Sequence, residues 1–225
     1  MPIRIAIDGP ASSGKGTVAR LTARRLDYAY VDTGAMYRAV ALLALRDGLS
    51  LSDGDSLGGL TRGLRFAFAW DGTRLQISVN GEDVSDAIRA ETVGQGASRV
   101  SIHPPVREAL LDQQRRLASA GGVVMEGRVI GTVVLPDAEL KIFLDASLDV
   151  RARRRTEEMI RRGMDASLET TRAEIQERDI RDRSRLVAPL RQAAGAVYLD
   201  TSALTPEEAV ERIASLAKAV GSAQD

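Results

Sequence analysis

Nine consecutive residues near the start of the chain have the composition of a phosphate-binding loop. The segment reads Gly9-Pro10-Ala11-Ser12-Ser13-Gly14-Lys15-Gly16-Thr17. Glycines let the backbone curl so that successive N–H groups converge on an anion, and the start of a following helix adds partial positive charge. Lys15 supplies a mobile ammonium for terminal phosphates, and Thr17 supplies a hydroxyl one place later than the usual position. A tight turn without a ligand remains the alternative, but it gives neither side chain a role.

The surrounding sequence predicts the strand and the helix that such a loop requires. The apolar run at residues 3–7 indicates a buried strand, and apolar positions over residues 18–26 recur at helical spacing. Further apolar runs predict strands at residues 28–32, 123–126, 140–144 and 197–200. Helical patterns cover residues 36–45, 91–120 with a break at the double proline 104–105, 168–185 and 207–219. This alternation predicts an α/β fold with a parallel sheet flanked by helices.

One region departs from this alternation and predicts a small antiparallel sheet. Residues 64–70 alternate between apolar and small or charged side chains and are followed by Asp71-Gly72. Residues 75–79 alternate in the same way before Asn80-Gly81. Asp-Gly and Asn-Gly between alternating segments are strong hairpin signals. We therefore expect a three-stranded antiparallel insertion within the α/β chain.

The overall composition narrows the classes of function. The 225 residues contain 31 Lys and Arg against 31 Asp and Glu, so no net charge favours nucleic acid or a membrane surface. The absence of cysteine excludes disulfides, thiolate metal sites and cysteine nucleophiles. His103 precedes the double proline, which favours a surface or helix-entry role. Without a membrane-length apolar run or a basic-then-apolar leader, we expect a cytoplasmic protein.

Arginines in four places suit the binding of a second phosphorylated ligand. Guanidinium groups are planar and permanently charged, so they match phosphate better than lysines do. The four places are Arg38, Arg107, Arg128 and a helix that carries Arg178, Arg181, Asp182 and Arg185. The spacing i, i+3, i+4 and i+7 predicts that the last four share one helical face. A solvated face with ion pairs is the alternative for this helix.

Two further groups of charged residues are candidates for the donor side of the site. The basic run Arg151–Arg155 is either a surface helix or a mobile flap over the donor phosphates. Asp8, Asp32 and Glu126 lie near the ends of predicted strands, where a carboxylate can orient Mg²⁺ through water. The sequence does not choose among the three carboxylates. We take Thr17 and Asp32 as the candidate metal ligands.

The order of several sequence blocks resembles the bacterial cytidylate kinase family over nearly the whole chain. The blocks are residues 5–11, 32–39, 106–110, 126–128, 130–132, 140–144 and 178–190. The resemblance implies a P-loop kinase fold with an antiparallel insertion in the acceptor region and a lid. It places the core at residues 1–35, 102–150 and 168–225, the insertion at about 36–101 and the lid at about 151–167. We expect the insertion and the lid to close over substrates, because closure keeps water from the donor phosphate.

The resemblance also implies an activity and a role for each site residue. The expected reaction is Mg²⁺-assisted, ATP-dependent phosphorylation of CMP and dCMP by an enzyme that is typically monomeric. The implied acceptor ligands are Arg38 and Arg128 for the phosphate, Thr33, Arg107 and Arg185 for the pyrimidine, and Ser98, Arg178 and Asp182 for the sugar. The implied donor ligands are residues 9–17 with Arg154 and Arg155 of the lid. The implied catalytic cations are Lys15, Arg128, Arg154, Arg178 and Arg185.

One position departs from the family's pattern. The family reads Glu-Gly-Arg-Asp-Ile-Gly-Thr, and this chain has Val129 where the aspartate is expected. In the family that carboxylate helps to recognise the exocyclic amine of cytosine, and valine cannot accept a hydrogen bond. An unmatched buried polar partner costs about 1–3 kcal/mol, so we expect CMP binding or the preference for CMP over UMP to be weaker by roughly tenfold to a hundredfold.

Three other functions stay open on the sequence alone. A kinase for another small acceptor, such as adenylate or shikimate, would share the phosphate loop but not the antiparallel insertion and the arginine-bearing helix. A nucleotide-binding module without catalysis is favoured only by Val129. Nucleic-acid binding through Arg151–Arg162 is disfavoured by the balanced charge and by the lack of aromatic stacking residues there.

Overall fold

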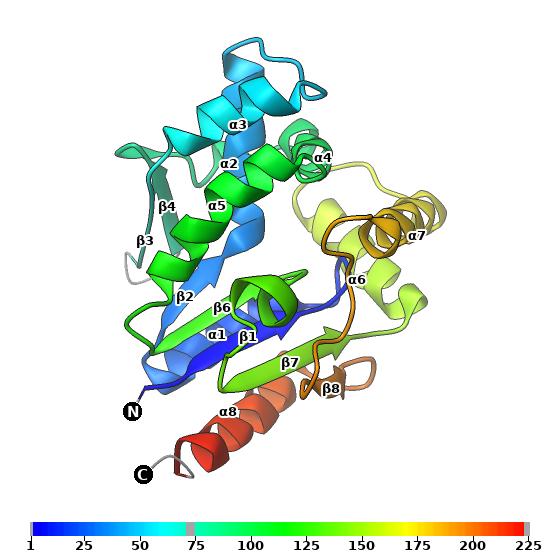
Figure 1. The fold of residues 1–225 in the computed structure, drawn as a ribbon. Helices are drawn as coiled ribbons and strands as arrows, with labels where there is room; N and C mark the ends of the chain where they lie inside the picture. The colour runs from blue at the N-terminus through cyan, green and yellow to red at the C-terminus, as the bar shows by residue number, and fades with distance from the viewer. Residues whose placement is uncertain (1, 71–74, 223–225) are drawn as a thin grey trace. The chain divides into compact units, whose positions relative to one another are not determined.

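The computed structural model of the protein describes residues 2–70 and 75–222. The predicted Asp71-Gly72 turn lies outside the described residues. The chain forms two compact units, one made of Met1–Tyr30 and Gly121–Asp225 and the other of Val31–Ala120. Figure 1 shows the elements of both along the chain.

A five-stranded sheet has the strand order β2-β6-β1-β7-β8, and all of it except the end of β2 belongs to the first unit. Its strands are β1 (Arg4–Asp8), β2 (Ala29–Asp32), β6 (Val123–Gly127), β7 (Leu140–Asp145) and β8 (Val197–Asp200). The central strand β1 pairs in parallel with β6 and β7, and β7 pairs in parallel with β8. Helices cover both faces of such a sheet, which explains why β1, β6 and β7 are almost continuously apolar and buried.

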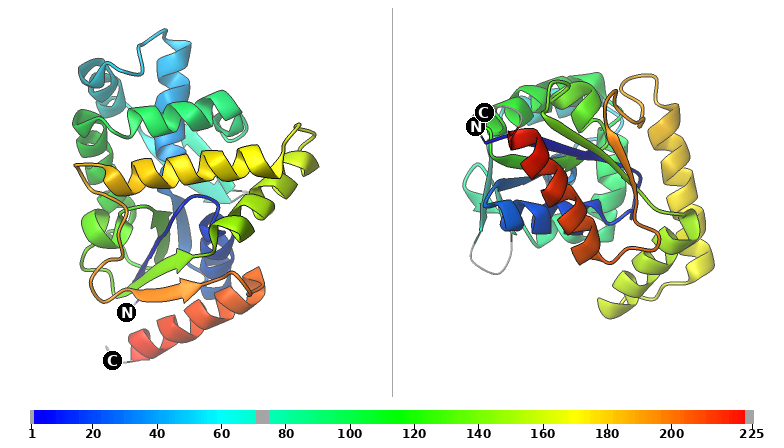
Figure 2. Two further views of the ribbon diagram at one scale, coloured as in Figure 1. Left: turned by 90° about the vertical axis from the view of Figure 1, so that its right-hand side faces the viewer. Right: turned by 90° about the horizontal axis from the view of Figure 1, so that it is seen from below.

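The first unit also contains helices in the part of the chain that the structure describes. They are α1 (Lys15–Leu26), α6 (Leu148–Arg161), α7 (Leu168–Ser184) and α8 (Pro206–Ser222). Helices α1 and α8 pack on each other and on the sheet, through apolar positions that include Val18, Ala209 and Ile213. Helices α6 and α7 pack side by side as a helical hairpin (Figure 2). The carboxyl ends of β1, β6 and β7 lead into the segments that carry the predicted site.

The second unit combines helices with a small antiparallel sheet. Its elements are α2 (Thr33–Arg46), α3 (Gly54–Arg62), β3 (Phe66–Trp70), β4 (Leu75–Val79), β5 (Glu82–Asp83), the short 3₁₀ helix η1 (Ala87–Arg89), α4 (Glu91–Val100) and α5 (Pro104–Leu117). Strand β4 lies between β3 and β5, and both pairings are antiparallel. The unit has its own core, built around Met36, Leu57, Ile88 and Leu110.

The three-stranded insertion predicted from the sequence is confirmed. Asn80 and Gly81, between β4 and β5, both have positive φ (52° and 87°), as the tight hairpin turn of an Asn-Gly pair requires. Helix α3 was not predicted. It begins after Asp53, whose carboxylate accepts a hydrogen bond from the backbone N–H of Ser56. This cap lies in a stretch rich in glycine, which hides the helical pattern in the sequence.

His103 has the helix-entry role that the sequence favoured. It is the residue before α5, and one ring nitrogen lies 2.9 Å from the carbonyl oxygen of Leu51. Within residues 2–70 and 75–222, no helix is long and apolar enough to cross a membrane.

Candidate active site

The glycine-rich segment forms a loop between β1 and α1, as predicted. Gly14 caps α1 with φ 89°, and Ser12 adopts a left-handed backbone conformation with φ 58°. The Lys15 side chain is buried, and its Nζ donates to the carbonyl oxygen of Pro10 at 2.7 Å. Burial lowers the pKa of the Lys15 ammonium, the nearby charge of Arg128 lowers it further, and the carboxylate of Glu126 opposes them. The lysine side chain is therefore folded back onto the loop, to which it would add positive charge for a bound phosphate.

A residue of the neighbouring strand explains why a glycine stands at position 16. A Cβ at this position would lie 2.9 Å from Oε1 of Glu126, so a serine or threonine would displace the carboxylate. Glu126 is the penultimate residue of β6, is buried, and accepts a hydrogen bond from the hydroxyl of Tyr30 at 3.0 Å. The hydroxyl that usually directly follows the lysine is supplied here by the next residue, Thr17, whose side chain is exposed. Glu126 and the start of α1 thus lie together.

A buried carboxylate connects the start of the phosphate loop with the segment after β6. The two oxygens of Asp8 each accept a backbone hydrogen bond at 2.7 Å, from Ile130 and from Gly131. These residues begin a short π-helical turn, η2 (Ile130–Val134). Burial raises the pKa of Asp8 to about 6, against the lowering effect of the two amides. Asp8 therefore fixes the backbone that carries Arg128 and Val129.

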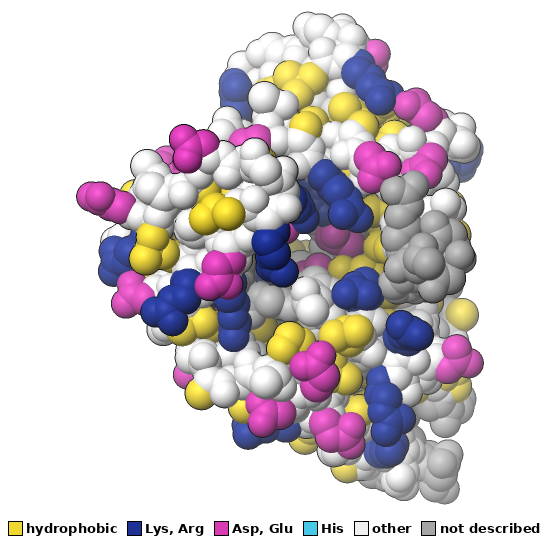
Figure 3. Space-filling model, turned by 180° about the vertical axis from the view of Figure 1, so that it is seen from behind, with side chains coloured by type: hydrophobic (Ala, Val, Ile, Leu, Met, Phe, Trp, Pro, Cys, Tyr) yellow, Lys and Arg dark blue, Asp and Glu magenta, His cyan; other side chains and the backbone are white. Residues whose placement is uncertain are grey.

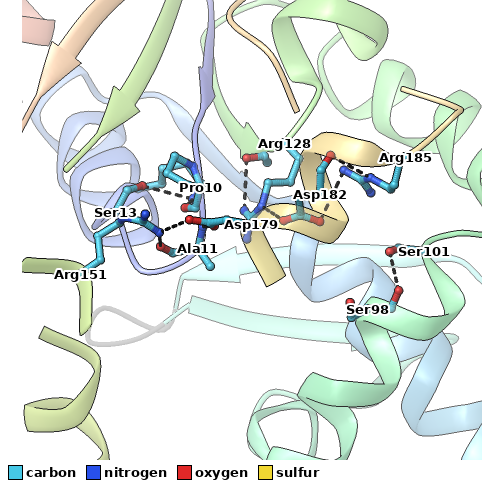
Figure 4. A network of polar contacts seen from close by, with 12 residues as sticks. Pro10, Ala11, Ser13, Ser98, Ser101, Arg128, Arg151, Asp179, Asp182 and Arg185 are labelled. Carbon is cyan, nitrogen blue, oxygen red and sulfur yellow. Dashed lines mark hydrogen bonds and ion pairs between the residues drawn. The ribbon is translucent and has the colours of Figure 1, made fainter. Parts of the chain in front are cut away.

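Arg128, Asp182 and Arg185 come together beside this segment (Figure 4). Nε of Arg128 donates to Oδ2 of Asp182 at 2.8 Å, and Nη2 of Arg185 lies 3.6 Å from Oδ1 of the same carboxylate. Burial by itself raises the pKa of Asp182, but the charges of Arg128, Arg185 and Arg178 outweigh it and hold the pKa below its ordinary value. One carboxylate thus orients two of the cations predicted for the acceptor nucleotide.

The predicted shared face of helix α7 is wrong in two respects. Arg181 is exposed and pairs with Glu177 at 3.8 Å on its own helix. Arg185 lies after the last helical residue with extended backbone angles, so its position is set by the turn and not by helical spacing. Asp179 and Asp182 are the buried polar residues of this part of α7.

Two of the arginines predicted for the donor side lie on α6. Nη1 of Arg154 lies 3.7 Å from the position that a Cβ on Gly14 would take, so this guanidinium borders the phosphate loop. It also donates to the hydroxyl and the carbonyl oxygen of Thr201 at 3.2 Å and 2.6 Å. Arg155 pairs with Glu158 at 3.2 Å on the same helix.

In the second unit, three predicted residues gather at the start of α2. Asp32 accepts from the backbone N–H of Ala35 at 2.9 Å and pairs with Arg38 at 2.7 Å. Thr33 is the first residue of the helix and is buried. Asp32 is therefore both a helix cap and the partner of the arginine predicted to hold the acceptor phosphate.

Ser98 and Arg107 meet through the backbone that joins α4 to α5. The hydroxyl of Ser101 donates to the carbonyl oxygen of Ser98 at 2.9 Å, and Nη1 of Arg107 donates to the carbonyl oxygen of Ser101 at 3.2 Å. The two residues predicted for the sugar and the base are thus neighbours within this unit.

Three residues that support the phosphate loop were missed by sequence reasoning. Arg151 and Asp179 form a buried ion pair at 2.6 Å and bond to the backbone of Ala11. The hydroxyl of Thr201 donates to the carbonyl oxygen of Ser13 at 3.3 Å. No spacing could reveal the contacts with Ala11 and Ser13, because their partners are more than a hundred residues away in the sequence.

On the face of the molecule drawn in Figure 3, basic side chains lie among acidic ones, in keeping with the equal numbers of both in the sequence. Among residues 2–70 and 75–222, no three or more His, Cys, Asp or Glu side chains are grouped as a metal cage.

The sequence is similar to those of known proteins over almost its whole length. The sequence model of the family described as Cytidylate kinase matches residues 5–219. A cytidylate kinase of Citrifermentans bemidjiense is 50% identical over 95% of this chain and 92% of its own length. One from Geobacillus thermodenitrificans is 52% identical over 94% of both chains. The solved structure of an uncharacterized protein from Eubacterium ventriosum aligns over 97% of this chain and 99% of its own with a TM-score of 0.52 at 13% identity, a likeness of fold alone. The match of the family model over almost the whole chain places it in the cytidylate kinase family.

Proposed function

We propose that the protein transfers the terminal phosphoryl group of ATP to CMP and dCMP. The observation that carries the proposal is the identity of about half of all residues with cytidylate kinases along nearly the whole chain. It is supported by a phosphate loop with a buried lysine and by the arginine pair held on Asp182. A reaction of this kind needs positioning and charge stabilisation and no protein nucleophile.

On the donor side, we propose that residues 9–17 hold the phosphates of ATP. Lys15 leaves the carbonyl oxygen of Pro10, 2.7 Å away, for the β- and γ-phosphates. Because its pKa is lowered by burial, the incoming phosphate charge also keeps the ammonium protonated. Arg154, beside Gly14, neutralises the donor from α6, with Arg155 one residue further along.

On the acceptor side, we propose that arginines bind the monophosphate and the nucleoside. Arg128 and Arg38, each oriented by a carboxylate, bind the phosphate. The remaining ligands are Thr33, Arg107 and Arg185 for the base and Ser98, Arg178 and Asp182 for the sugar. Arg128, Arg178 and Arg185 with Lys15 and Arg154 neutralise the charge that develops during transfer. Val129 leaves the selectivity for cytosine weaker than in the family's pattern.

Residues at the start of α1 fit a magnesium ion bound with the donor phosphates. Mg²⁺ prefers oxygen ligands and keeps most of its water, so one hydroxyl and one carboxylate suffice from the protein. Thr17 is exposed, and the carboxylate of Glu126 borders Gly16. When bound, the ion neutralises phosphate charge during transfer. We propose Thr17 with Glu126 as the protein's oxygens, and Asp32 as the second candidate carboxylate.

We also propose how the chain is organised for this reaction. Residues of about 36–101 and 151–167 close over the nucleotides, around a core of 1–35, 102–150 and 168–225. The enzyme acts as a monomer in the cytoplasm. The expected insertion lies within the compact unit Val31–Ala120, which folds around its own core.

A substrate panel tests the proposed function. Initial rates with ATP as donor are measured for CMP, dCMP, UMP, AMP and shikimate, with Lys15→Ala as the control variant. We expect the highest kcat/KM for CMP and dCMP, and a loss on the order of a hundredfold or more in Lys15→Ala. Preference for AMP or shikimate would indicate a different kinase, and ATP binding without turnover would indicate a regulatory module.

A further inference from the structure

We propose that Arg151 and Asp179 form a positioning pair that sets the affinity of the phosphate loop for the donor. The inference rests on the proposed function, because it assigns the loop to ATP. Asp179 is not among the residues predicted to touch a nucleotide, and Arg151 was predicted only as part of the basic run Arg151–Arg155. Both are buried, and both bond to the backbone of Ala11 (Figure 4).

The contacts of the pair hold one loop residue from both sides. Nη1 of Arg151 donates to the carbonyl oxygen of Ala11 at 3.0 Å and pairs with Oδ2 of Asp179 at 2.6 Å. The other oxygen of Asp179 accepts from the backbone N–H of Ala11 at 3.3 Å. Nε of Arg151 donates to the carbonyl oxygen of Ala146 at 2.9 Å, which ties the arginine to the end of β7. The loop is thus anchored to α6, α7 and the sheet together.

This anchoring determines which loop amides remain for a phosphate. A peptide unit is planar and trans, so its C=O and N–H point in opposite directions. Holding the Ala11 carbonyl toward Arg151 therefore turns the N–H of Ser12 away from the pair. The contact of Thr201 with the Ser13 carbonyl has the same effect on the N–H of Gly14. Convergent N–H groups of this kind are what binds an anion in a phosphate loop.

The loop needs external support because its own conformation is unfavourable. Ser12 has φ 58°, a left-handed conformation that is unfavourable for a residue with a side chain. Lys15 supports the Pro10 carbonyl only until it turns to the donor phosphates. The pair formed by Arg151 and Asp179 keeps its hydrogen bonds to Ala11 whether Lys15 contacts the Pro10 carbonyl or the donor phosphates. We therefore assign it a role in preorganising the loop, which lowers the cost of binding the donor.

Conservative variants separate this role from general stability. Arg151→Lys keeps the charge but loses the fork that reaches three oxygens, and Asp179→Asn keeps the shape but loses the charge. The matched controls are Arg172→Lys and Asp149→Asn, because Arg172 and Asp149 also pair between α7 and α6, at 2.7 Å, but are exposed and do not touch the loop. The readouts are the KM for ATP, the KM for CMP, kcat, and the calorimetric Kd of inorganic tripolyphosphate.

We expect Arg151→Lys and Asp179→Asn to raise the KM for ATP and the Kd of tripolyphosphate about tenfold, with the KM for CMP within about twofold of wild type. The double variant should bind ATP and tripolyphosphate no more weakly than the worse single variant, since either substitution already disrupts the same ion pair. Both controls should match wild type. The proposal is overturned if tripolyphosphate binds the variants as wild type does, if both KM values rise together, or if the losses simply add. Weakened tripolyphosphate binding in a protein that does not phosphorylate CMP would support the pair and reject the proposed function.

Discussion

Asp182 holds Arg128 through a hydrogen bond of 2.8 Å from Nε, and the same carboxylate lies 3.6 Å from Nη2 of Arg185. The carboxylate thus sets the direction of two guanidinium groups from different segments. Without it, the arginines would repel each other and lose their orientation.

We therefore predict that Asp182→Asn raises the KM for CMP by roughly tenfold to a hundredfold, because hydrogen bonds between charged groups contribute about 1.5–3 kcal/mol each. The KM for ATP should change far less. Initial rates with each nucleotide varied in turn measure both constants. Arg181→Gln is the matched control, since Arg181 is exposed and pairs only along its own helix. Equal changes in both KM values would contradict an acceptor role for Asp182.

A second prediction concerns the valine at position 129, which is buried before η2. Val129→Asp should raise the ratio of kcat/KM for CMP to that for UMP by roughly tenfold to a hundredfold, because the carboxylate can accept from the cytosine amine. Val129→Ala, which removes volume without adding an acceptor, should leave the ratio unchanged. An unchanged ratio in Val129→Asp would mean that another group already recognises the amine.

A third prediction distinguishes the two carboxylates proposed for the metal. Glu126→Gln should raise the Mg²⁺ concentration for half-maximal rate about tenfold, a typical effect of losing a carboxylate near a bound ion. Asp32→Asn should leave that concentration unchanged. It should instead weaken the ion pair that orients Arg38, the partner of Asp32 at 2.7 Å. Magnesium titrations at saturating ATP and CMP measure both effects. The reverse pattern would make Asp32 the metal residue.

A fourth prediction follows from the pKa of Asp8, which burial raises from 3.8 to about 6. A carboxyl group whose pKa is higher in the folded protein stabilises it most at low pH, and that contribution is lost as the pH rises through the folded pKa. Asp8→Asn does not titrate. Its cost in free energy of unfolding should therefore shrink between about pH 4 and pH 7, by up to about 3 kcal/mol. Denaturant unfolding of both proteins at several pH values tests this, and a cost that grows with pH would refute it.

Much of the fold could be predicted because it depends on local patterns. The strand–loop–helix around Lys15, the continuous apolar runs of the central strands and the Asn80-Gly81 turn are all recognisable in short windows of sequence. Helix α3 (Gly54–Arg62) was missed, because its glycines conceal a helix that depends on the cap at Asp53 and on packing against α5.

The site was predictable in its residue types but less so in their orientation. The spacing on α7 suggested one face for Arg178, Arg181, Asp182 and Arg185, yet Arg181 is exposed and Arg185 lies past the helix end. Likewise, the run Arg151–Arg155 does not show which arginine is buried. Arg151 is buried because Asp179 of the next helix and the Ala11 carbonyl, 140 residues away in the sequence, lie opposite it.

The first glycine of the phosphate loop has a consequence for how this protein can vary. A Cβ on Gly9 would lie 1.9 Å from the carbonyl oxygen of Leu144 in β7, far inside any tolerable approach. Position 9 is therefore closed to every larger amino acid even before a nucleotide arrives. Because the clash is with the backbone of Leu144, no change of side chain there would relieve it, and engineering of the loop has to begin downstream of Gly9.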